Sequence, residues 1–128
     1  MSLRSPLRRV LGLGSARGGS SHWYAQRVTA IALVVLGTWF VGSLATLGGG
    51  SYAQVSGWLR SPLVSALTLL FVVVAAQHAN LGLRVVIEDY VAAPAARFAA
   101  LLAVRFALIV AAVVGVLAVL RIAFGVAA

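Results

Sequence analysis

The sequence has 128 residues, of which 62% are hydrophobic and only 9% are charged. In a soluble domain about a quarter of the residues are charged, so this composition excludes an ordinary water-soluble fold and indicates an integral membrane protein. The net charge of +8 comes from arginines that flank apolar runs, which argues against nucleic-acid binding, and the absence of cysteine excludes disulfides and cysteine-ligated metal centres.

Three apolar runs are long enough to cross a bilayer, which takes about 20 residues. They cover residues 28–47, 62–83 and 98–120. We therefore predict an all-α membrane protein with three transmembrane helices. The remaining segments are an N-terminal segment (1–27), two connections (48–61 and 84–97) and a short tail (121–128). No soluble domain fits beside them.

Arginine placement predicts the orientation. With the N-terminus inside, seven arginines fall on the inner side, namely Arg4, Arg8, Arg9, Arg17, Arg27, Arg84 and Arg97. Only Arg60 and Arg121 fall outside, so the positive-inside rule places the N-terminus inside and the C-terminus outside. The basic, serine-containing segment 1–27 would also suit a mitochondrial transit peptide, but we interpret it as retained.

Turn signals mark both connections. The first, 48–61, contains the string GGGSY, so we expect an irregular outer connection. Ser61 and Pro62 then form a helix start, with serine as the N-cap and proline at the first helical position. Pro94 is expected to begin the third helix in the same way.

His78 is the most informative residue of the second span, because an ionisable group within a membrane is costly. Gln77, His78 and Asn80 could simply hydrogen-bond to neighbouring helices. Alternatively, His78 could be an axial haem ligand. Ala75, Ala79 and Gly82 form a small-residue stripe that would admit a flat ring or another backbone. Since His22 precedes the first span, a bis-histidine haem would need its second ligand from another polypeptide.

The only two acidic residues, Glu88 and Asp89, lie side by side before Tyr90. Asp89 follows His78 by about three helical turns, or roughly 16 Å, on nearly the same face. These residues could form an ordinary helix end, with a carboxylate beside Arg84 or Arg97. Alternatively, a tyrosine hydroxyl and a carboxylate could bind a quinone headgroup and relay protons to it.

Two further arginines have alternative interpretations. Arg27 is the last charge before the first span and could be an interfacial anchor or could pair with a carboxylate such as a haem propionate. Arg105 lies about two turns into the third span, where it could extend to the inner interface or pair with a polar group.

Three strings, GLGSARGG, SHWYAQRVTAIAL and HANLGLRVVIEDYV, resemble the hydrophobic membrane anchor subunit of succinate dehydrogenase, the respiratory succinate:quinone oxidoreductase. The resemblance extends from about Val10 through the third span. Its most specific part is H-x3-G-x6-D-Y, together with the arginine before the first span. Related sequences often carry a histidine just after D-Y-V, where this chain has Ala92, which puts a proton-uptake role at that position in doubt.

The resemblance implies roles for particular residues. His78 matches the axial ligand of haem b, with the other histidine on a cytochrome b subunit. Tyr90 and Asp89 match the ubiquinone site, while Arg27 matches the arginine near the haem propionates and His22 lies where a further polar contact is expected. FAD and iron–sulfur clusters would belong to the flavoprotein and iron–sulfur subunits.

The implied function is to attach those subunits to the membrane and to pass electrons from succinate to ubiquinone, as part of the tricarboxylic acid cycle and the respiratory chain. The chain would pack with the cytochrome b subunit as a haem-bearing bundle and would have no activity alone. A fumarate reductase anchor and a cofactor-free structural subunit are the alternatives, whereas a transporter would require an acid in mid-span. We expect a bacterial inner membrane, with the mitochondrial inner membrane as the alternative.

Overall fold

The computed structural model describes residues 19–125, and every regular element in that part of the chain is an α-helix. Three helices are long and apolar enough to cross a membrane, namely α2 (Gly19–Leu47), α4 (Pro62–Tyr90) and α5 (Pro94–Ala123). A fourth, α3 (Tyr52–Leu59), is short. The all-α fold with three spanning helices is confirmed. Residues 1–18 and 126–128, which include Arg4, Arg8, Arg9 and Arg17, lie outside the described residues.

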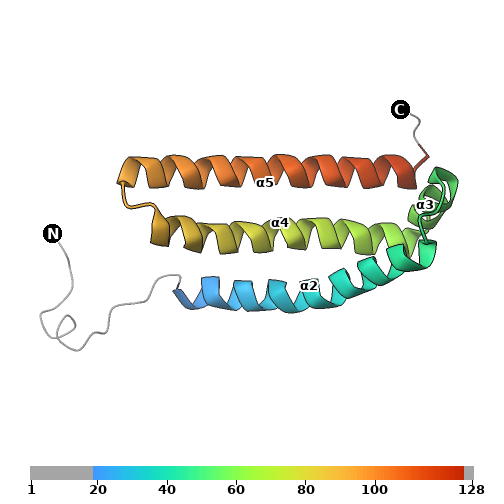
Figure 1. The fold of residues 1–128 in the computed structure, drawn as a ribbon, viewed down its shortest axis with the longest axis horizontal. Coiled ribbons are helices and arrows are strands. Elements are labelled where there is room, and N and C mark those ends of the chain that lie inside the picture. The colour runs from blue at the N-terminus through green and yellow to red at the C-terminus, as the bar shows by residue number, and fades with distance from the viewer. Residues whose placement is uncertain (1–18, 126–128) are drawn as a thin grey trace, which may run out of the picture.

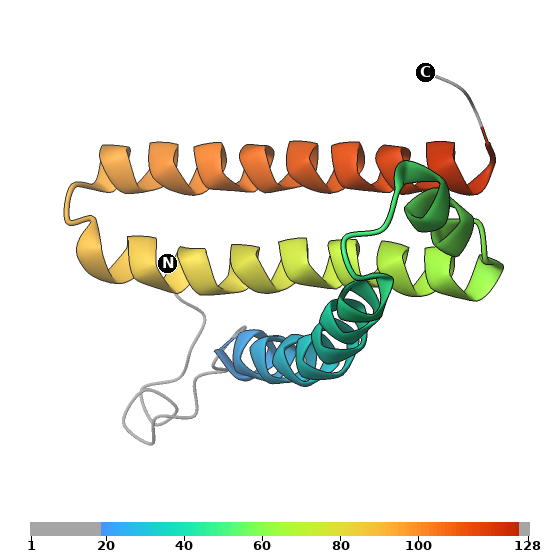
Figure 2. The ribbon, with the colours of Figure 1, turned by 45° about the vertical axis from the view of Figure 1, so that its right-hand side comes forward.

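The three long helices alternate in direction, and α4 lies between α2 and α5 and contacts both (Figure 1). The start of α2, the end of α4 and the start of α5 share one end of the bundle, while α3 lies at the other end. Figure 2 shows α2 inclined to the α4–α5 pair. The sequence predicts that the start of α2 faces the inside of the cell. The end of α4, where Tyr90 lies, is at this same end of the bundle.

All three long helices continue beyond the apolar runs in the sequence. Helix α4 extends through Arg84, Glu88 and Tyr90, which the sequence placed in a connection, so these side chains project from a regular helix. Pro62 and Pro94 occupy the first turns of α4 and α5, as predicted. Ser61 is the N-cap of α4, but its side chain makes no capping hydrogen bond.

The prediction of an irregular connection over residues 48–61 is wrong for α3. Helix α2 ends where Gly48 and Gly49 adopt positive φ angles of 56° and 76°. A capping box then starts α3, because the Ser51 side chain accepts a hydrogen bond from the Gln54 backbone N–H and the Ser51 N–H donates to Gln54 Oε1. The sequence S-x-x-Q carried this signal, but the preceding glycines obscured it.

An aromatic cluster holds α2, α3 and α4 together at the α3 end. The Phe40 and Phe71 rings stack with centroids 5.0 Å apart, and the Trp39 and Trp58 rings stack at 6.0 Å. Elsewhere few side chains are enclosed, since the buried apolar residues of the described chain are Leu36, Leu59, Leu81 and Val119. An apolar surface this open requires lipid or partner helices around it.

Candidate functional site

His78 lies in the second half of α4, on the side that faces α2. Its ring Nδ1 is 2.9 Å from the hydroxyl oxygen of Thr29 on α2, a contact between residues far apart in the sequence. No hydrogen bond is found to the other ring nitrogen of His78 within the described part of the chain. The imidazole is thus held from one side and keeps one nitrogen available.

Polar side chains continue from Thr29 toward the start of α2. His22, Gln26 and Thr29 follow the i, i+4, i+7 spacing, so they share one helix face. His22 Nε2 and Gln26 Oε1 are shielded from solvent, and neither atom has a hydrogen-bond partner among residues 19–125. Buried polar atoms normally have partners, so a polar group not present among the described residues is required there.

The Gln26 side chain of α2 lies beside Gly82 of α4, one turn from His78. A Cβ atom placed on Gly82 would lie 3.6 Å from Nε2 of Gln26, which is ordinary van der Waals contact. The small-residue stripe predicted two possible neighbours, a flat ring or another backbone. At Gly82 the neighbour is the Gln26 side chain of α2.

The end of α4 presents Asp89 and Tyr90 outward. Tyr90 is the last residue of the helix and is 85% exposed. Arg84 pairs with Glu88, since its Nε donates to Glu88 Oε1 at 2.8 Å. Arg97 is engaged by the backbone, since its Nε donates to the Val91 carbonyl at 2.9 Å. A carboxylate does lie beside Arg84, as the helix-end interpretation expected, but it is that of Glu88 and not of Asp89.

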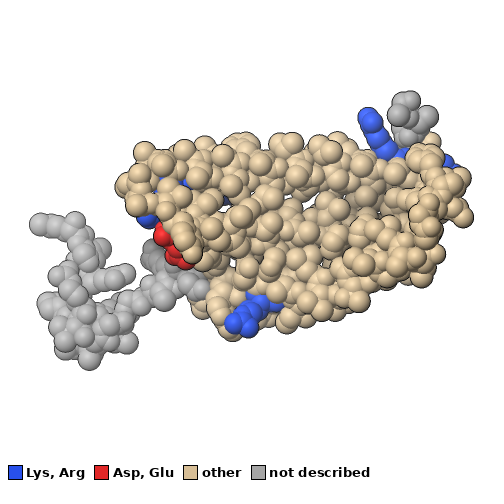
Figure 3. Space-filling view, in the orientation of Figure 1, with Lys and Arg blue, Asp and Glu red and all other residues tan. Residues whose placement is uncertain are grey.

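Charged side chains gather at this end of the bundle (Figure 3). Asp89 is exposed and forms no hydrogen bond or ion pair within residues 19–125. Its carboxylate and the Tyr90 hydroxyl are thus both available to a molecule that docks against the end of α4. Neither residue lines either of the two pockets between α4 and α5 that the described residues form. A site formed with them needs further walls from elsewhere.

Arg27 lies on α2, and no hydrogen bond or ion pair joins it to His78 or Tyr90 within the described residues. Its guanidinium carbon is 5.0 Å from the centroid of the Trp23 ring, a cation–π geometry. This arrangement suits the interfacial anchor interpretation and leaves the hydrogen-bonding edge of the guanidinium available for a carboxylate.

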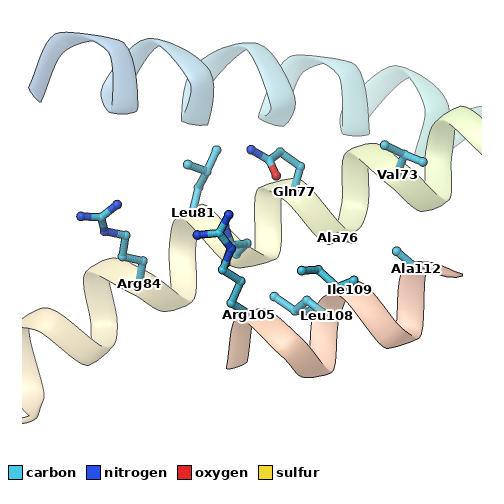
Figure 4. A pocket seen from close by; sticks show the side chains of 10 residues that line it. Val73, Ala76, Gln77, Leu81, Arg84, Arg105, Leu108, Ile109 and Ala112 are labelled. Atoms are coloured by element: carbon cyan, nitrogen blue, oxygen red, sulfur yellow. The ribbon is translucent and has the colours of Figure 1, made fainter. Parts of the chain in front are cut away.

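A groove of about 520 Å³ between α4 and α5 is a feature that the sequence did not predict. Its polar lining residues are Gln77, Asn80, Arg84 and Arg105. Figure 4 shows the Arg105 side chain extending from α5 toward α4. Gln77, Asn80 and Arg84 thus line this groove, whereas the His78 ring contacts Thr29 of α2. The i, i+3, i+7 spacing of Gln77, Asn80 and Arg84 could have indicated this second polar face of α4.

Residues 1–117 match the family model described as the succinate dehydrogenase/fumarate reductase transmembrane subunit. The chain is 33% identical over 117 residues to a Rickettsia bellii protein named succinate dehydrogenase hydrophobic membrane anchor subunit, with 91% of this chain and 93% of that protein covered. Proteins of the same name from Paracoccus denitrificans and Rickettsia conorii are 37% and 40% identical. The Paracoccus denitrificans match covers 67% of each chain. The Rickettsia conorii match covers 61% of this chain and 63% of that protein.

Proposed function

Because the chain belongs to the succinate dehydrogenase/fumarate reductase transmembrane subunit family, we propose that it is the membrane anchor subunit of a bacterial succinate dehydrogenase. In this proposal α4 contributes one axial ligand to haem b and one wall to a ubiquinone site. The observation that carries it is the arrangement of α4 itself. His78 is held by Thr29 within the bundle, while Asp89, which has no ion pair among the described residues, and exposed Tyr90 lie at the helix end.

The surroundings of His78 fit a haem ligand. A neutral imidazole with one nitrogen hydrogen-bonded and the other available is the usual form of a ligating histidine. When bound there, haem b would supply one-electron transfer. The second axial ligand would come from the cytochrome b subunit, since His22, the other histidine of this chain, lies in the first turn of α2.

Arg27 and His22 are proposed to lie on the propionate side of the haem. The guanidinium of Arg27 stacks on Trp23, so its edge can form the paired hydrogen bonds that a carboxylate accepts. His22 Nε2 is buried without a partner, as expected of an atom that completes its hydrogen bond with a bound group.

Tyr90 and Asp89 are proposed to bind ubiquinone. The phenol of Tyr90 would donate a hydrogen bond to a quinone carbonyl oxygen and orient the headgroup. Reduction of a quinone to a quinol consumes two electrons and two protons. Asp89 would transfer protons from the aqueous side to the quinone oxygens, because its carboxylate forms no ion pair with Arg84 or Arg97.

The electrons would come from partner chains. We propose that a flavoprotein subunit with FAD oxidises succinate and that an iron–sulfur subunit passes the electrons to the membrane. This chain and the cytochrome b subunit would hold that assembly at the inner face of the bacterial cytoplasmic membrane. The exposed apolar helix faces leave room for partner helices, and no activity is expected from this chain alone.

Fumarate reductase is the second candidate, because the matching family description covers both enzymes. The two enzymes catalyse one reaction in opposite directions, and an anchor subunit carries no residue that selects the direction.

Deletion of the chain tests the proposal. We expect succinate oxidation with an artificial acceptor to move from the membrane pellet to the soluble fraction, with loss of succinate-dependent ubiquinone reduction. Re-expression of the chain should restore both. Unchanged membrane-bound ubiquinone reductase activity in the deletion strain would overturn the proposal.

A further inference from the structure

The Thr29 hydroxyl lies at a point where three groups compete for its single proton. Its oxygen is 2.8 Å from the carbonyl oxygen of Ala25, 3.1 Å from that of Gln26 and 2.9 Å from Nδ1 of His78. The two carbonyls belong to the preceding turn of α2, and His78 belongs to α4. The hydroxyl therefore joins the backbone of one helix to the imidazole of the other.

Hydrogen-bond accounting decides how the imidazole is oriented. A carbonyl oxygen can only accept, and a hydroxyl has one proton to give. If Thr29 donated to His78, its oxygen would face the Ala25 carbonyl at 2.8 Å with lone pairs on both atoms. If Thr29 donates to Ala25 instead, its oxygen accepts from a protonated Nδ1, and the two shortest contacts both become hydrogen bonds.

The geometry points to Thr29 as the positioning residue of the haem ligand. It selects the His78 tautomer with the proton on Nδ1 and thereby leaves the Nε2 lone pair for iron. This inference rests on the proposed ligand role of His78. It adds a role that neither the spacing nor the family resemblance assigned, because Thr29 lies in α2 at a distance of 49 residues in the sequence.

The hydrogen bond that Thr29 accepts from Nδ1 would also affect a bound iron. A hydrogen-bond acceptor on the second ring nitrogen makes a ligating imidazole more basic, which favours the ferric over the ferrous state. Removal of the Thr29 hydroxyl should therefore raise the midpoint potential of the haem. It should also weaken haem binding, because the ring loses its fixed orientation.

The test uses the assembled complex and four variants. Thr29→Val keeps the shape and removes the hydroxyl, Thr29→Ala removes both the hydroxyl and the methyl group, and Thr29→Ser retains the hydroxyl. The matched control is Thr38→Val, because Thr38 donates to the Val34 carbonyl of α2 at 2.6 Å in the same way but is exposed. Assembly of each variant is checked by membrane-bound succinate oxidation with an artificial acceptor.

We expect Thr29→Val and Thr29→Ala to raise the haem midpoint potential and to lower apparent haem affinity by about 10- to 100-fold. Thr29→Ser and Thr38→Val should match the wild type. Should Thr29→Val fail to assemble, Thr29→Ala carries the same comparison with Thr29→Ser. Wild-type potential and haem content in an assembled hydroxyl-free variant would overturn the inference.

A complex with His78→Ala distinguishes failure of the Thr29 inference from failure of the proposed ligand role of His78. If it loses the b-type spectrum while the Thr29 variants remain like the wild type, only the role of Thr29 is wrong. If the His78→Ala spectrum is unchanged, the ligand assignment in the proposed function is wrong, and the role of Thr29 falls with it.

Discussion

The two polar regions of α4 differ in how much of their environment this chain supplies. His78 is enclosed on one side by α2, with a hydrogen bond from its ring to Thr29 and with Gln26 packed beside Gly82 one turn away. Asp89 and Tyr90 project from the end of the same helix with no partner in the described chain. One region is oriented before any partner arrives, and the other is exposed until one does.

This difference follows from what each group is proposed to do. A haem ligand must present one atom in a fixed direction, and packing within a helix bundle provides that constraint. A quinone must enter and leave, so its site gains from an accessible surface that partner subunits complete. Substitutions at the two regions should therefore have separable effects, one on the haem spectrum and the other on quinone turnover.

Asp89→Asn should give the larger effect on quinone turnover. Loss of a group that delivers protons lowers a rate by on the order of 100-fold, so succinate:ubiquinone reductase activity should fall to that extent. Glu88→Gln is the matched control, because Glu88 forms an exposed ion pair with Arg84. An ion pair of this kind contributes about 0–1 kcal/mol to stability. Equal loss in both variants would show that the Asp89 carboxylate has no special part.

Tyr90→Phe should lower the same activity by about tenfold, the effect of one hydrogen bond of roughly 1.4 kcal/mol. Succinate oxidation with an artificial acceptor and the haem spectrum should be unaffected. Tyr52→Phe provides the control at the opposite end of the bundle, where that side chain is 80% exposed. If Tyr90→Phe reduced both activities alike, a defect in assembly would replace the quinone role.

Gly82→Leu should affect haem retention rather than quinone turnover, so its effect on turnover should be the smallest of the three. A leucine would displace Gln26 and push α2 away from α4, at a cost of about 1–3 kcal/mol for overpacking. The thermal stability of haem retention should fall while ubiquinone reduction by the assembled complex persists. Gly42→Leu is the control, since nothing lies within 4 Å of an added Cβ atom there. Identical melting of the two variants would argue against the α2–α4 contact as the support of His78.

Much of the architecture was predictable because length and hydropathy determine it. Three apolar runs require three helices in a bilayer, and Pro62 and Pro94 mark two of the helix starts. Helix α3 was missed because glycines at 48–50 dominate the local composition, while the capping box depends on the pair Ser51 and Gln54. Local capping chemistry outweighed composition over that segment.

The candidate site was predictable only in part. The rarity of acids and histidine identified His78, Asp89 and Tyr90, but spacing could not decide which acid pairs with Arg84. The role of Thr29 depends on how two helices pack, and a threonine at that point of an apolar helix has no distinctive sequence signal. The groove around Arg105 likewise arises from the contact between α4 and α5.

The reduced-minus-oxidised absorption spectrum of the purified complex tests the central claim, with wild type compared with His78→Ala. We expect a b-type haem signal in the wild type that is lost or altered in the variant, while succinate oxidation with an artificial acceptor remains in the membrane. An identical haem spectrum in the two complexes would contradict the assignment of His78 as the ligand.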